Sequence, residues 1–340
     1  MTTDPLSVSQ DEVRAAIDGV PAAKGSDVRS VRRLTGGVSN ETFRVETDRG
    51  VFILRVAPIG GSGGNAHDML REFEVLELAR GFGAPAPEPL GRGHLKAQPE
   101  RSFLIMSAID GFAPAPGADL SLTESEANEL CRRFVTTLAN LHRESAGSVG
   151  SPRVSVRPGF TGRQVVGWTR RHAKLDPDDI YEGFRNQLLR GVPDTEMPPC
   201  LIHNDYKFDN LVLDSNDHSS IRGVLDWELS GFGDPRLDLG SALAYWVEQD
   251  DPEELRAIKR GPTDMIGMLT RQELVAAYEE AARTSLSHMP FFEAFGLFKL
   301  AVIALQVDRQ LANGKRYDGR FAGFAELLLE RSQTRAFDAS

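Results

Sequence analysis

The chain has 340 residues, of which 41% are hydrophobic and 26% charged, as in an ordinary globular protein of one or two domains. Its formal net charge of -10 argues against a broad nucleic-acid-binding surface. The only two cysteines, Cys131 and Cys200, are too few for a disulfide framework and lie in apolar surroundings. We therefore expect buried free thiols in a reducing cytoplasm.

Nothing in the sequence predicts a membrane protein. The N-terminal residues lack the basic and apolar pattern of a signal peptide. No apolar run approaches the roughly 18 residues that a membrane span needs. We expect a cytoplasmic protein without a membrane partner, and the sequence leaves its oligomeric state open.

The first third of the chain reads mainly as strands. Residues 11–20 predict a leading helix, and alternating apolar residues predict strands at 31–34, 41–47 and 51–56. A glycine-containing turn joins the first two strands. A helix at 67–80 and a strand at 101–106 follow. Between them, the glycine-rich segment 60–65 lacks the Gly-Lys-Ser/Thr ending of a P-loop, so we interpret it as a mobile loop.

The remainder reads mainly as helices, after a proline-rich seam at 113–117. Capping boxes at Thr123–Glu126 and Thr270–Glu273 predict two helix starts. The apolar segment 291–311 predicts a buried helix rather than a membrane span, because Lys299 and Asp308 interrupt it. Segment 321–337 predicts a closing helix. We thus expect an α+β protein with an N-terminal lobe at 1–108 and a C-terminal lobe at 109–340.

Within the helical lobe, one stretch carries three polar side chains in an order that indicates a cation site. Asp205 and Asn210 follow a short apolar run, and Asp226 ends the second of two short apolar strands, 211–214 and 221–225. A hairpin made of these strands would bring Asn210 and Asp226 to the same end. Two oxygen ligands there suit a hard cation such as Mg²⁺.

The order Asp205, Asn210, Asp226 also meets the needs of phosphoryl transfer from ATP. One carboxylate must orient an attacking hydroxyl and accept its proton, and an amide oxygen and a second carboxylate must hold the magnesium ions. Protein kinases solve this with an H-x-D-x-x-x-x-N loop and a later D-F-G motif. Here His203-Asn204-Asp205 through Asn210 matches the loop, and Asp226-Trp227-Glu228 stands in the place of D-F-G.

With these motifs, the chain resembles the aminoglycoside phosphotransferase family of the protein-kinase-like fold, from about residue 31 to the final helices. Within the family it is most similar to the kinase-like domains attached to some acyl-CoA dehydrogenases. The resemblance implies a bilobal fold, with a small antiparallel sheet lobe plus one helix and a large helical lobe. It also implies ATP and Mg²⁺ as cofactors and a small hydroxylated acceptor, such as a hydroxy acid or its CoA thioester rather than an antibiotic.

The resemblance further implies roles for single residues. Asp205 would be the catalytic base, Asn210 and Asp226 would hold magnesium, Glu72 would orient the cation on the third strand, and Asp238 would brace the catalytic loop. The segment beside the adenine would contain Ile105, Met106 and Ala108. The loop over the phosphates would contain Thr35, Gly36, Gly37, Ser39 and Asn40.

Lys207 and His203 flank the catalytic Asp205. Lys207 would contact the transferred phosphoryl group, or it would face the acceptor and recognise an anionic substrate. His203 is expected to brace the loop. We expect acceptor contacts from the C-terminal helices and from 155–200, where aromatic and basic residues mix: Phe160, Trp168, Arg170, Arg171 and His172.

One departure from the family pattern leaves two readings open. The third strand carries Arg55 where the family usually has a lysine, and we expect Arg55 to bind phosphate and to pair with Glu72. An inactive nucleotide-binding protein is therefore one alternative to an active kinase. A protein kinase is another, although no long activation segment or A-P-E motif follows Asp226.

Overall fold

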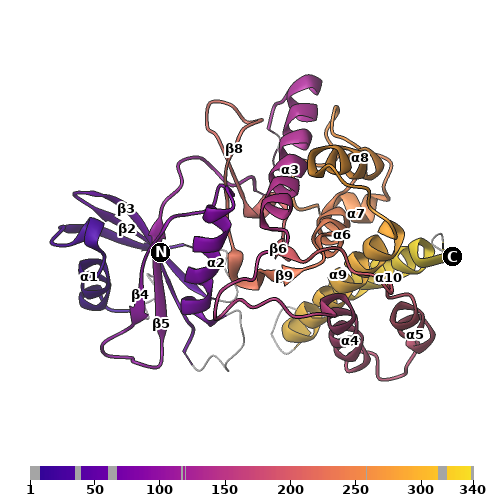
Figure 1. Ribbon diagram of the computed structural model, residues 1–340, viewed down its shortest axis with the longest axis horizontal. Coiled ribbons are helices and arrows are strands. Elements are labelled where there is room, and N and C mark those ends of the chain that lie inside the picture. Colours follow the sequence, from indigo (N-terminus) through magenta and orange to yellow (C-terminus); the bar gives the residue numbers. More distant parts are fainter. Residues whose placement is uncertain are drawn as a thin grey trace.

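The computed structural model describes residues 8–34, 40–59, 67–115, 118, 120–257, 259–312 and 320–337. An antiparallel sheet forms one end of the molecule and a group of helices forms the other (Figure 1). The expected bilobal α+β architecture is therefore confirmed. The boundary expected at 108/109 falls just after the last strand of the sheet. The glycine-rich segment expected at 60–65 lies outside the described residues.

The N-terminal lobe is built on a five-stranded sheet with the order β1-β2-β3-β5-β4 and antiparallel neighbours throughout. Successive side chains of a strand point to opposite faces. On β3, Phe52, Leu54 and Val56 therefore share one face, and Arg55 lies on the other. The strands are β1 (Val28–Arg33), β2 (Glu41–Thr47), β3 (Gly50–Val56), β4 (Pro89–His94) and β5 (Ser102–Ser107).

One helix covers each face of this sheet. Helix α1 (Gln10–Asp18) starts at a capping box between Ser9 and Glu12 and packs against the face of Leu54. Helix α2 (Met69–Gly81) begins at Asp68, whose carboxylate accepts from the N–H groups of the first turn. Its apolar residues pack on the opposite face, which looks toward the helical lobe (Figure 1).

The C-terminal lobe confirms both capping boxes, since Thr123 and Thr270 each accept from the third residue of the helix. Its helices are α3 (Glu124–Ser145), α4 (Phe160–Ala173), α5 (Glu182–Arg190), α6 (Pro235–Tyr245), α7 (Glu253–Arg256), α8 (Arg271–Ala282), α9 (Met289–Ala312) and α10 (Arg320–Phe337). Two short pairs of strands accompany them: β6 (Cys200–Ile202) with β9 (Gly231–Gly233), and β7 (Leu211–Leu213) with β8 (Ile221–Val224).

Helix α9 is the central helix of this lobe. By length and composition it is the one described helix that could cross a membrane, but 56% of its apolar window is buried inside the protein. It lies against α6 and α10 (Figure 1). Gly240 of α6 and Gly296 of α9 meet at the crossing, where a Cβ on either would run into the backbone of the other helix. The close crossing fixes α6 and α9 relative to each other.

Candidate active site

The predicted catalytic loop follows β6, and Asp238 of α6 holds it. Both carboxylate oxygens of the fully buried Asp238 accept backbone N–H groups, from His203 at 2.5 Å and from Asn204 at 2.7 Å. Burial alone would raise the pKa of Asp238, but its bonds to His142 and to the loop outweigh burial and lower it. An ionised Asp238 thus sets the path of the chain into Asp205.

Asn204 adopts a left-handed conformation, with φ of 67°. Its side chain donates to the Leu229 carbonyl at 3.0 Å, and its own carbonyl accepts from Lys299 Nζ at 2.7 Å. His203 braces the loop as expected, because its Nε2 lies 2.8 Å from the Leu225 carbonyl. Three separate elements therefore hold the two residues before Asp205.

Asp205 makes two side-chain bonds through the same carboxylate oxygen. Its Oδ2 accepts from Lys207 Nζ at 2.6 Å and from Asn210 Nδ2 at 3.0 Å. The Tyr245 hydroxyl also forms a hydrogen bond with Asp205. Lys207 also lies over the ring of Tyr245, with its nitrogen 4.9 Å from the centroid. The amide of Asn210 uses its nitrogen in this arrangement and keeps its oxygen for a cation.

The expected hairpin brings Asn210 and Asp226 together. Strands β7 and β8 pair, and the Leu225 N–H donates to the Asn210 carbonyl at 2.7 Å. Asp226 follows in a left-handed conformation, with φ of 64°. The fit to Mg²⁺ is good, because one carboxylate and one amide oxygen are a common protein contribution when phosphates and water complete the shell. No group of three or more His, Cys, Asp or Glu in the described residues could hold a metal ion by itself.

Arg55 lies among three carboxylates. Its Nη1 is 3.1 Å from Glu72 and 3.1 Å from Asp226, and its Nη2 is 2.8 Å from Glu228. Burial opposes the charge of Arg55, but the three carboxylates outweigh burial and raise its pKa. Burial raises the pKa of Glu72 against the opposing charge of Arg55. The buried Arg55 Nε has no partner among the described residues.

Glu228 is a site residue that the sequence analysis missed. One carboxylate oxygen accepts from Asn40 Nδ2 at 2.6 Å and from Arg55, and the Glu228 carbonyl accepts from Arg71 at 3.1 Å. Asn40 precedes β2, and Arg71 lies on α2. Glu228 thus joins three parts of the N-terminal lobe to the segment that carries Asp226.

A cavity of about 1470 Å³ lies between the two lobes. Most of the predicted site residues that the structure describes line it: Asn40, Arg55, Glu72, Met106, Ala108, Asp205, Lys207, Asn210 and Asp226. Ile105 does not, because its side chain is buried on the opposite face of the sheet beneath α1. Thr35, Gly36, Gly37 and Ser39 lie outside the described residues. The functional roles of all these residues stay predictions.

The wall contributed by the C-terminal lobe combines apolar side chains with basic residues and with the carboxylates of Asp205, Asp209, Asp226 and Glu228. Trp168 lines it, and Arg171 stacks on that ring at 4.5 Å, while Phe160, Arg170 and His172 do not line the cavity. His172 is instead buried between Tyr181 and Phe298. The apolar side chains come from α9 and α10 and include Leu300, Ile303, Val307, Phe321, Phe324 and Leu328. The basic ones are Lys207, Arg256, Lys259, Arg260 and Lys299.

Comparison with known proteins agrees with this geometry. Residues 30–274, well over half of the chain, match the phosphotransferase enzyme family. The chain belongs to this family. Acyl-CoA dehydrogenase family member 11 of Rattus norvegicus is 32% identical over 291 residues, which cover 82% of this chain. The matched part is 37% of that relative, so this chain spans little more than a third of its length.

Solved structures show the same fold. A candidate aminoglycoside phosphotransferase from Ralstonia eutropha aligns with a TM-score of 0.76 at 20% identity, over 97% of this chain and 98% of the other. An aminoglycoside phosphotransferase in ternary complex with ADP and hygromycin B aligns with a TM-score of 0.60 at 15% identity, over 92% and 95% of the two chains. At these identities the likeness concerns the fold alone.

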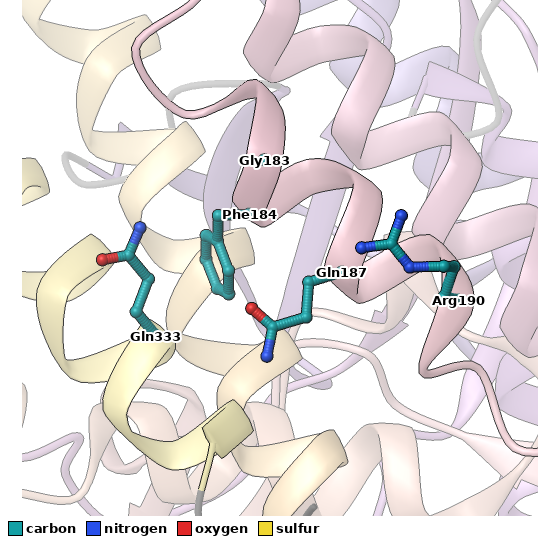
Figure 2. A pocket seen from close by; sticks show the side chains of 5 residues that line it. All are labelled: Gly183, Phe184, Gln187, Arg190 and Gln333. Atoms are coloured by element: carbon teal, nitrogen blue, oxygen red, sulfur yellow. The ribbon is translucent and has the colours of Figure 1, made fainter.

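The protein has a second pocket, of about 600 Å³, between α5 and α10 (Figure 2). Phe184, Gln187 and Arg190 of α5 and Gln333 of α10 line it together with Gly183. None of the predicted site residues contributes to this pocket. It contains one cation and no carboxylate, so it lacks the groups for acid–base chemistry.

Proposed function

We propose that this phosphotransferase is an ATP- and Mg²⁺-dependent kinase of a hydroxyl group on a small molecule. The convergence of Asp205, Asn210 and Asp226 on one cavity carries the proposal. ATP would supply the phosphoryl group, and Mg²⁺ would neutralise charge on its phosphates. Asp205 would accept the proton as the acceptor oxygen attacks the γ-phosphoryl group and ADP leaves.

The lining of the cavity supports an acceptor that is partly apolar and anionic. Of the cations of the C-terminal wall, Lys299 is partly buried and has no carboxylate partner among the described residues, which favours an anionic group on the acceptor. The side chains of α9 and α10 would accept a hydrocarbon chain. A hydroxy acid or its CoA thioester meets both conditions. The name of the rat relative, acyl-CoA dehydrogenase family member 11, also refers to a CoA thioester.

Two other functions remain as alternatives. The Arg55–Asp226 ion pair favours an inactive nucleotide-binding protein, because it occupies a carboxylate oxygen that a cation would need. Against this, Asp205, Asn210 and Asp226 are all present and face one cavity. A protein kinase is disfavoured, because α6 already begins at Pro235 and leaves no room for a long activation segment after Asp226.

The deciding experiment measures ADP release with ATP and Mg²⁺ over hydroxy acids, their CoA thioesters, aminoglycosides, macrolides and amino alcohols. Acceptor-dependent turnover in the wild type is expected, together with a loss of about 100-fold or more in Asp205→Asn while ATP still binds. Asp226→Ala should lose the Mg²⁺ dependence of ATP binding, and the exposed Asp250→Ala serves as the control. ATP binding without turnover on any acceptor would select the inactive alternative.

A further inference from the structure

Lys299 is the feature of the cavity that the proposed chemistry does not use. It lies on the apolar helix α9, where most neighbouring positions are buried hydrophobic residues. Its side chain is partly buried and lines the cavity. Holding an ammonium group in such surroundings is unfavourable unless something compensates its charge. Packing alone therefore does not explain a lysine at this position.

The partners that Lys299 has do not supply that compensation. Its hydrogen bond in the described part of the chain goes to the neutral carbonyl of Asn204 at 2.7 Å, and its nitrogen lies 5.8 Å from the ring centroid of Trp168. No carboxylate of the described residues comes within 4.0 Å of it. Burial lowers the pKa of Lys299, while the more distant charges of Asp205 and Asp238 oppose that shift. An ammonium group has three donors, so two remain for the cavity.

Three of the other four basic residues of the wall are paired with a carboxylate, and the fourth, Arg256, is exposed on the short helix α7. Lys207 is paired with Asp205 at 2.6 Å, Lys259 with Asp264 at 2.5 Å, and Arg260 with Asp209 at 3.7 Å. Lys299 is thus a cation of the cavity wall with no paired carboxylate in the described residues. Lys299 lies close to the proposed base Asp205, because it donates to the carbonyl of Asn204, the residue directly before Asp205.

We propose that Lys299 is a specificity-determining residue, which binds a carboxylate or a thioester carbonyl oxygen of the acceptor beside Asp205. This inference rests on the proposed function. Trp168 forms a flat surface next to the bound group, and the side chains of α9 and α10 take the rest of the acceptor. The acceptor must then carry an oxygen acceptor close to its reacting hydroxyl. A simple alcohol or an amino alcohol lacks it.

Three probes with the same secondary hydroxyl test the proposal: 3-hydroxyoctanoate, its neutral amide 3-hydroxyoctanamide, and the cationic 1-amino-octan-3-ol. With the wild type, kcat/KM should fall in that order. The CoA thioester of the acid tests whether Lys299 binds a thioester carbonyl oxygen. Lys299→Met should lower kcat/KM for the acid by about 30-fold, the loss of one hydrogen bond to a charged group, and leave the KM for ATP within about twofold. Lys299→Arg should restore most of the preference for the acid.

A purely structural role would give a different pattern. If Lys299 only holds the Asn204 carbonyl, Lys299→Met would reduce turnover of the acid, of the amide and of 1-amino-octan-3-ol by the same factor, and the proposal would be wrong. The matched control is Lys174→Met, because Lys174 is an exposed lysine at the end of α4. It should leave the ratio between acid and amide unchanged.

A second measurement does not depend on catalysis. Acetylation of lysines in the wild type, followed by mass spectrometry, reports whether 3-hydroxyoctanoate slows modification of Lys299 relative to Lys174. Protection by the acid and none by the amine would support the proposal, and equal or absent protection would overturn it. If the wild type turns over none of the probes, the kinase proposal fails for this acceptor class, and the protection experiment still decides the role of Lys299.

Discussion

Asn40 Nδ2 donates to the Glu228 carboxylate at 2.6 Å, although the two residues lie 188 positions apart. The same carboxylate oxygen accepts from Arg55 at 2.8 Å, and Glu228 is buried. Asn40 ends the predicted phosphate loop, and Glu228 follows the predicted magnesium ligand Asp226. Their contact ties the two parts of the predicted nucleotide site into one unit.

Glu228→Gln should loosen this unit. The amide can still accept one bond, but its NH₂ group would face a donor, and Arg55 would lose one of its three carboxylates. We expect the free energy of unfolding to fall by about 2 kcal/mol and the KM for ATP to rise by about tenfold. Denaturant unfolding and ATP titration measure these changes. The exposed Glu182→Gln is the control, and an unchanged KM would show that the contact does not position the nucleotide.

Arg55→Ala should be more damaging than Arg55→Lys. The alanine variant leaves Glu72, Asp226 and Glu228 buried or half-buried without their cation, at a cost of about 3–5 kcal/mol. Lysine retains the charge but cannot contact three carboxylates with one nitrogen. Unfolding in denaturant and ATP binding should rank the variants wild type, Lys, Ala. Equal losses in both would mean that the guanidinium fork itself is required, and Arg55→Met separates lost charge from lost volume.

Tyr245→Phe should change the proton-handling of Asp205 without changing nucleotide binding. The Tyr245 hydroxyl faces Asp205, and burial together with the charge of Asp205 raises the pKa of Tyr245. Its ring lies under Lys207. Without the hydroxyl, Asp205 loses a hydrogen bond that orients its carboxylate. We expect kcat to fall by about tenfold with an unchanged KM for ATP. An unchanged kcat would exclude the contact from the reaction.

Tyr245→Leu extends this test by removing the ring as well as the hydroxyl. If the ring helps to hold Lys207, acetylation of Lys207 should be faster in Tyr245→Leu than in Tyr245→Phe. Equal rates in the two variants would show that Asp205 alone holds Lys207 in place.

Asp238→Asn should destabilise the fold in a pH-dependent way. The folded-state pKa of Asp238 lies below the ordinary value of 3.8, so its ionised form stabilises the fold above that pH. That contribution disappears as the pH falls through the folded-state pKa. We expect the variant to be less stable than the wild type by about 3 kcal/mol at neutral pH, because an amide cannot accept both loop N–H groups. Urea unfolding should show the gap closing below pH 3.8, and a constant gap would contradict this account.

Local signals in the sequence predicted much of the fold. The two capping boxes marked helix starts, because the cap and the third residue bond within one turn and need no distant partner. The meander at β1–β3 followed from apolar alternation. Strand β4 was not predicted, because Pro89, Gly91 and Gly93 are residue types that are depleted in strands. It lies at the edge of the sheet, where a missing N–H is tolerated.

The candidate site likewise contains one part that the sequence predicted from local signals and one part that depends on distant contacts. The hairpin that unites Asn210 with Asp226 is local in sequence, so spacing and alternation were enough to predict it. Glu228, Tyr245 and Lys299 acquire their roles only through contacts with distant elements. For Lys299 the sequence contains one signal, a single lysine inside an apolar helix. The sequence contains no comparable signal for Tyr245, whose position depends on where α6 ends.

In the β7–β8 hairpin, the distance between Asn210 and Asp226 at the open end does not depend on the length of the turn at the other end. Asn210 and Asp226 are held by the first bonds of the ladder, whereas the turn at 214–220 lies at the other end. Asp217 and His218 contact Arg133 and Leu120, so the second half of this turn is tied to the rest of the lobe. Ser215 and Asn216 are exposed, and a label attached there would leave the bonds that hold the two oxygen donors in place.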